Sequence, residues 1–125
     1  MNFKQFALLV FTFIAMSSCG GRYYYFEPGN SLTMVLHQGE TKSVTLQIGR
    51  MNCDEAINFH LENDLKPDNL SFTFQPNPVV GNSVTLSVAA TNQAALGKFL
   101  VVLEGTNACN DGRRREFFGL EILAP

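Results

Sequence analysis

The sequence has little charge of either sign and no long apolar stretch, and each shortage excludes a class of protein. Nine Lys and Arg stand against eleven Asp and Glu among 125 residues. General nucleic-acid binding is therefore excluded, because it requires a basic surface. The apolar run at residues 6–16 is about 11 residues long, whereas a membrane-spanning helix needs roughly 20. We expect no transmembrane helix in the mature chain.

The sequence also lacks motifs of catalysis and metal binding. No serine lies in a nucleophile-elbow pattern, and no glycine-rich loop precedes a predicted helix. His37 and His60 have no carboxylate or thiol at metal-ligand spacing, so we expect them to be solvated. Asp54, Glu55 and Asp111 match no calcium-loop motif and are expected to be solvated turn residues. We predict that the chain is not an enzyme and binds no metal or other cofactor.

The first residues have the pattern of an export signal, with Lys4, then the apolar run, then small residues. The quartet Met-Ser-Ser-Cys at 16–19 resembles a bacterial lipobox, in which an aliphatic and two small residues precede a cysteine. The resemblance implies a lipoprotein signal peptide over residues 1–18. It also implies a diacylglycerol on Cys19 and acylation, for example by palmitate, of the new amino terminus. The alternative is an ordinary cleaved signal that leaves Cys19 as a free thiol.

The residue after this cysteine bears on the destination of the protein. In the Gram-negative form of the lipobox family, an aspartate there marks retention in the inner membrane, and this chain has Gly20. The resemblance therefore implies a lipid anchor in the cell outer membrane. We expect residues 19–31 to form a lipidated tether. Its aromatic segment, residues 23–26, is expected to add a short edge strand to the domain, or else to rest at the lipid interface.

From residue 32 onward, apolar residues recur at every second position, which is the period of a β-strand. Seven strands are predicted, with the apolar faces Leu32, Met34, Leu36; Val44, Leu46, Ile48; Ile57, Phe59, Leu61; Leu70, Phe72, Phe74; Val84, Leu86, Val88; Phe99, Val101, Leu103; and Phe118, Leu120, Ile122. Glycine, proline and asparagine turns separate them. Seven short strands with one apolar face each predict an all-β, two-sheet sandwich over residues 32–125.

Two segments resemble the bacterial immunoglobulin-like modules of secreted enzymes and surface proteins. Residues 72–107, FTFQPNPVVGNSVTLSVAATNQAALGKFLVVLEGTN, have that family's aromatic strand, Pro-Asn-Pro, glycine turn, alternating strand and final aromatic-led strand. Residues 37–50, HQGETKSVTLQIGR, are similar to its second strand and the turn before it. The family often has Tyr where this chain has Phe99. The resemblance implies a seven-stranded immunoglobulin-like sandwich without shared catalytic residues.

Three cysteines leave one without a sulfur partner. In a seven-stranded sandwich of alternating strand direction, the loop after the second strand and the loop after the sixth lie at the same end. Cys53 lies in the first loop and Cys109 in the second, and an exported protein favours a disulfide. We therefore expect a Cys53–Cys109 bridge, which leaves Cys19 for lipid.

A basic run beside the expected bridge is the first candidate binding site. Arg113, Arg114 and Arg115 are either a solvated hairpin end that discourages edge pairing or a site for a carboxylate or phosphate.

An apolar group on the last two predicted strands is the second candidate. Leu100, Val102 and Phe117 lie on the outward phase of these strands and are expected to form an interface patch. The alternative is that the aromatic segment at residues 23–26 folds back and covers them.

These observations predict a lipid-anchored envelope protein that acts by binding or structural association. Its partner is expected to be a protein or glycan in the envelope or outside the cell. The alternative is an accessory subunit or inhibitor of an envelope enzyme, contacting it through residues 50–56 and 106–115. A hydrolase with a site that the sequence does not reveal is a weaker option.

Overall fold

The fold is known from a computed structural model that describes residues 21–109 and 114–125. Its elements are β1 (Tyr23–Phe26), β2 (Thr33–His37), β3 (Thr41–Met51), β4 (Asn58–Leu61), the 3-10 helix η1 (Glu62–Asp64), β5 (Leu70–Gln75), β6 (Ser83–Ala90), β7 (Gly97–Thr106) and β8 (Arg114–Leu123). Over these two ranges, no helix is long and apolar enough to cross a membrane.

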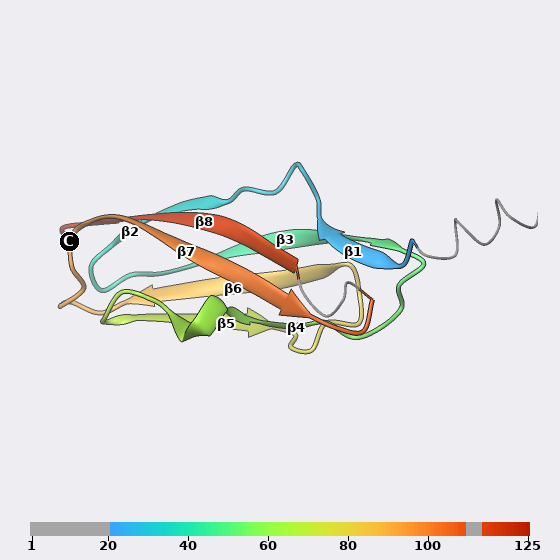
Figure 1. The fold of residues 1–125 in the computed structure, drawn as a ribbon. Coiled ribbons are helices and arrows are strands. Elements are labelled where there is room, and N and C mark those ends of the chain that lie inside the picture. The colour runs from blue at the N-terminus through green and yellow to red at the C-terminus, as the bar shows by residue number, and fades with distance from the viewer. Residues whose placement is uncertain (1–20, 110–113) are drawn as a thin grey trace, which may run out of the picture.

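The strands form two four-stranded sheets that pack as two layers (Figure 1). The first sheet has the order β1-β3-β6-β5, and the second has the order β2-β8-β7-β4. Neighbouring strands are antiparallel, except that β2 and β8 are parallel. The predicted all-β sandwich is confirmed, but the predicted strand count of seven is wrong, because the described residues form eight strands.

The additional strand is β1, which pairs with β3 from Tyr23↔Met51 to Phe26↔Ile48. The expected edge strand in the aromatic segment is thereby confirmed, and the sandwich begins before residue 32. Tyr24 and Phe26 are buried, whereas Tyr23 and Tyr25 are half-buried with ring centroids 5.9 Å apart. An all-aromatic stretch has no alternation of polar and apolar residues, so the strand period is invisible in its sequence.

The seven predicted apolar faces make up most of the core. Every residue of those faces is either buried or packed against the buried cluster. In β6, for example, every second side chain is buried and those between are exposed or half-buried, as the two-residue period of a strand requires. Fully burying a large apolar side chain such as Phe118 or Leu46 stabilises the fold by about 1.5–3 kcal/mol.

After β1, the chain leaves the first sheet and crosses to the second (Figure 1). Asn30 fixes this crossing, because its side chain donates to Gln47 O (2.9 Å) and accepts from Gln47 N–H (2.7 Å). β2 then pairs with the C-terminal half of β8, from Thr33↔Gly119 to His37↔Leu123. Gly39 closes the following turn with a φ of 81°, a conformation that favours glycine.

Candidate binding surface

One end of the sandwich is closed by a disulfide. Cys53 in the loop after β3 and Cys109 in the loop after β7 are bonded, with their Cα atoms 6.0 Å apart, so the predicted pair is confirmed. The chain enters the sandwich at this same end, where Arg22 Nε donates to Asn52 O over 3.1 Å. Cys19, the predicted lipidation site, lies outside the described residues.

Arg50 organises the loops around the disulfide. Its guanidinium donates to the carbonyl oxygens of Cys53 (3.2 Å), Glu55 (2.8 Å), Val79 (3.2 Å) and Gly81 (2.9 Å). Several carbonyl acceptors around one planar fork match the donor geometry of arginine. This structural role was not predicted, because it depends on two loops that are distant in sequence.

The outer face of the second sheet carries the predicted apolar patch. Leu100 and Phe117 are 66% and 62% exposed, and Val102 is half-buried directly opposite Phe117. The prediction that these three residues share a face is confirmed. The suggestion that the aromatic segment covers them is wrong, because β1 belongs to the first sheet.

The patch continues toward β2 as a shallow hollow. Gly119 lies opposite Leu100 and has no side chain to fill the space there. The hollow has a volume of about 260 Å³, and Val35, Lys98 and Glu121 are among the residues that line it. Lys98 Nζ lies 4.0 Å from Glu121 Oε2 at the rim. An exposed apolar centre with a charged rim is the composition of a protein interface.

The opposite rim of the patch is built around a buried carboxylate. Glu104 is only 5% exposed although it is on the outer face of β7. His60 Nε2 on β4 donates to Glu104 Oε1 (2.8 Å), and Arg115 Nε on β8 donates to Oε2 (3.2 Å). Arg115 Nη2 also lies 3.3 Å from Glu62 Oε1. His60 is therefore on the outward face, as predicted, but it is bonded to Glu104 rather than fully solvated.

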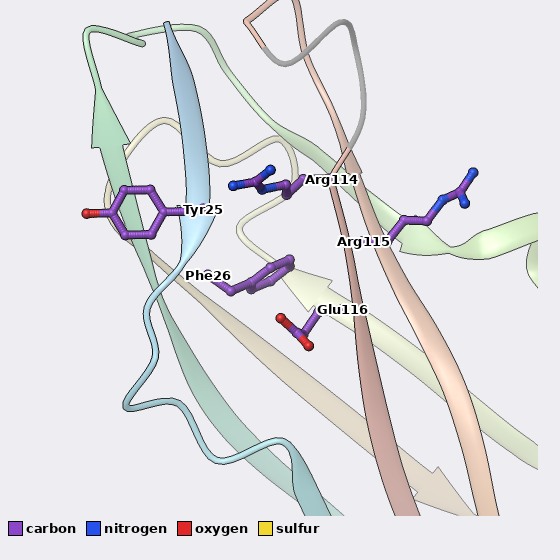
Figure 2. A pocket seen from close by; sticks show the side chains of 5 residues that line it. All are labelled: Tyr25, Phe26, Arg114, Arg115 and Glu116. Atoms are coloured by element: carbon purple, nitrogen blue, oxygen red, sulfur yellow. The ribbon is translucent and has the colours of Figure 1, made fainter. Parts of the chain in front are cut away.

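Two residues of the predicted basic run, Arg114 and Arg115, lie in a strand rather than at a loop tip. Arg113 lies outside the described residues, while Arg114 and Arg115 begin β8 and point to opposite sides of it (Figure 2). The physical reason is the strand itself, whose successive side chains point to opposite faces. Arg115 forms ion pairs with Glu104 and Glu62.

Arg114 points toward β1 and lines a hollow of about 480 Å³ with Tyr25, Phe26 and Glu116 (Figure 2). Across the two described ranges, no ion pair holds Arg114. Arg115 also lines the hollow, which therefore presents two arginines and one carboxylate beside two aromatic rings.

The nearby phenol of Tyr24 is strongly affected by its surroundings. Burial raises its pKa well above the usual range, the Arg114 charge opposes this rise, and the Glu104 carboxylate adds to it. The phenol therefore stays neutral in the folded protein at ordinary pH.

Histidine side chains are also common metal ligands. His37 Nδ1 donates to Ala124 O over 2.7 Å at an exposed strand end. Among the described residues, no group of three His, Cys, Asp or Glu side chains converges on a point that could hold a metal ion.

Comparisons with known proteins show the fold alone. No protein-family model matches the chain, and no curated protein matches it. Domains 4 and 5 of the S-layer protein SbsC match with a TM-score of 0.56 and 9% identity, over 82% of this chain and 54% of that chain. Domains 1–6 of SbsC match with a TM-score of 0.57 and 9% identity, over 82% of this chain and 14% of that chain. A family 123 glycoside hydrolase from Clostridium perfringens matches with a TM-score of 0.51 and 12% identity, over 77% and 23%. The chain therefore spans about half of the first of these structures and much less of the others.

Proposed function

We propose that this chain is a lipid-anchored envelope protein whose non-catalytic, immunoglobulin-like domain binds another envelope protein through the outer face of its second sheet. The observation that carries the proposal is the exposed patch of Leu100, Val102 and Phe117. It lies between two charged rims on the second sheet, and no described segment covers it. Exposed apolar groups of this kind mark interaction sites.

The strand order supports the immunoglobulin-like assignment. The first strand pairs in one sheet, and the chain then crosses so that β2 runs parallel to the last strand in the other sheet. All other neighbouring strands are antiparallel. This arrangement fits the two-layer plan expected from the resemblance at residues 37–50 and 72–107.

The signal pattern and the disulfide support an exported protein. The lipobox resemblance supports the lipid anchor, and Gly20 after the cysteine supports the outer membrane as its destination. The structural neighbours include domains of a surface-layer protein, which is compatible with a structural or binding role at the cell surface.

The position of the anchor favours the outer face over the loops as the partner surface. Cys19 and Arg22 are three residues apart, a reach of about 10 Å. A lipid on Cys19 would hold the disulfide end close to the bilayer, which restricts access to the loops at 50–56 and 106–115. An accessory subunit that used those loops would have to bind next to the membrane.

The anchor is tested by intact-mass measurement of the full chain purified from an envelope-bearing bacterial host. We expect the mass of a chain cut before Cys19 plus acyl groups, and loss of membrane association in Cys19→Ala. A wild-type chain without acyl mass would refute the anchor and leave the binding role untouched.

The binding role is tested by Phe117→Lys, which places a charge in the centre of the patch. Because Phe117 is exposed, the fold should keep its stability, while recovery of the partner in detergent extracts of the envelope should fall about tenfold or more. Thr45→Lys, on the exposed face of the first sheet, is the matched control and should leave recovery unchanged. Equal recovery with both variants would contradict the proposal.

A further inference from the structure

The four strands at the edges of the two sheets differ in how their free backbone groups are covered. An uncovered edge is a template for pairing with another strand. β1 is only four residues long, and the chain soon reaches Pro28, which has no N–H to donate. On the free edge of β2, Lys42 Nζ donates to Val35 O over 2.8 Å. Both edges are thus protected.

The edge of β4 is covered by the loop that follows β5. Ile57, just before β4, forms a bridge with Val79, with N···O distances of 2.9 and 2.8 Å. The side chain of Asn77 then replaces a strand, because it accepts from Phe59 N–H (3.0 Å) and donates to Phe59 O (2.9 Å). A neighbouring chain therefore has no access to these groups.

β5 is different, because part of its edge remains open. Thr91 N–H donates to Asn69 O, which shows that the odd-numbered residues of β5 bond to β6. The N–H and C=O groups of Leu70, Phe72 and Phe74 consequently point away from the sheet. Lys66 Nζ donates to Leu70 O over 2.7 Å. In the part of the chain that the structure describes, nothing bonds to the outward backbone groups of Phe72 and Phe74.

The open edge lies beside a groove of about 530 Å³ between β4 and β5. Phe59, Phe72 and Phe74 are among its lining residues, and the rings of Phe59 and Phe74 stack with centroids 5.7 Å apart. The strand itself, LSFTFQ, carries no charge. Charges are a common means of blocking edge pairing, and β5 lacks them.

We propose that β5 pairs antiparallel with β5 of a second copy of this chain, about a two-fold axis at Thr73. This register places Phe72 of each copy opposite Phe74 of the other. In each of these two pairs, the outward N–H of one residue donates to the outward C=O of the other, and the reverse. It also forms two cross-strand aromatic pairs, which stabilise sheets. Thr73 then faces Thr73 of the second copy on the exposed side of the sheet. The first sheets of the two molecules join into one continuous sheet.

The charges near β5 are compatible with this register. Asp64 and Lys66 lie before the start of β5. The antiparallel arrangement places the opposite end of the second copy's β5 there, with the uncharged residues Gln75 and Asn77. Neither charge meets its own copy, so no like charges are opposed. The surface is distinct from the outer face of the second sheet, so this inference does not depend on the proposed function.

Cysteine cross-linking in the full chain tests the register directly. In Thr73→Cys, the two new thiols belong to a non-hydrogen-bonded pair with Cα atoms about 4.5 Å apart, within reach of a disulfide. In Ser71→Cys, the control, the two thiols are about four residues apart along the strand, roughly 13 Å, which is too far. We expect disulfide-linked dimers in intact cells for Thr73→Cys, with Ser71→Cys no higher than the wild type, which sets the background.

A charge variant tests the association without sulfur chemistry. Thr73→Lys opposes two lysines across the axis and should raise the dimer dissociation constant about tenfold in sedimentation of the detergent-solubilised full chain. Ser71→Lys faces Gln75 and should change it little. The proposal is overturned if the wild-type chain stays monomeric, if Thr73→Lys dimerises as well as Ser71→Lys, or if both cysteine variants cross-link equally. A monomeric chain that instead bound an added extended peptide at β5 would assign the edge to a heterologous strand.

Discussion

At the scale of single residues, Glu104 shows what a strand pattern can and cannot predict. The alternation along β7 correctly predicts that this residue faces outward. It does not predict that Glu104 is buried, because His60 and Arg115 cover it from strands on either side. That coverage depends on the register between three strands, which no local pattern contains.

Tyr24 gives a residue-scale prediction about alkaline pH. Its pKa is raised in the folded chain, mainly by burial, whereas the unfolded chain releases this proton near pH 10. The stability that Tyr24 contributes is therefore complete below pH 10 and is lost as the pH rises above it. We expect the free energy of unfolding to fall more steeply between pH 10 and 12 in the wild type than in Tyr24→Phe. Urea denaturation at a series of pH values measures this, and parallel curves would refute it.

Gly105 gives a second residue-scale prediction. A Cβ atom added there would contact the hydroxyl of Tyr24 and lie 2.8 Å from Phe59 Cε1 and 3.0 Å from Ile57 Cγ2, all within the core. Gly105→Ala should therefore cost about 1–3 kcal/mol by overpacking. Gly119→Ala is the matched control on the neighbouring strand, because its Cβ would meet nothing closer than 3.6 Å. Equal unfolding free energies for the two variants would show that the packing around Gly105 is looser than described.

At the scale of elements, the strands with alternating polar and apolar residues were predictable from that alternation. The edge strand β1 has no such alternation and was indicated only by its aromatic residues. The seven predicted strands are all present because alternation reports one buried face directly. The disulfide followed from the alternating direction of the seven predicted strands and did not depend on the total number of strands. The role of the arginine run stayed open at the level of sequence, because its surroundings depend on β8, which begins within the run at Arg114.

The disulfide end provides the prediction at this scale. The bridge joins residues 56 apart, and the chain-entropy model gives a stabilisation of about 4 kcal/mol for such a loop. Changing Cys53 and Cys109 together to Ser should lower the free energy of unfolding by up to this amount. The loop after β3 should stay protected in amide hydrogen exchange because Arg50 still binds it. The described part of the loop after β7, residues 107–109, should lose protection, including the N–H of residue 109 that donates to Asn107 Oδ1. Loss of protection in both loops, or in neither, would contradict this division.

At the scale of the whole molecule, the sequence could predict the two-layer architecture but not the partner of either sheet. Strand period and turn residues predict a sandwich, and the outward phase of β7 and β8 predicts the patch. The open edge of β5 could not be predicted, because the distant residues that cover the other edges are known only from the fold. The comparisons add the fold and no ligand.

The central claim, that the outer face of the second sheet contacts a partner in the envelope, is tested most directly by site-specific photo-crosslinking. A benzophenone amino acid replaces Phe117 in the full chain in its native envelope, and the same group replaces Thr45 on the first sheet as a control. The account predicts one defined adduct with another protein from position 117, absent from position 45 and weakened by an added Leu100→Lys. No adduct at position 117, or the same adduct from both positions, would contradict it.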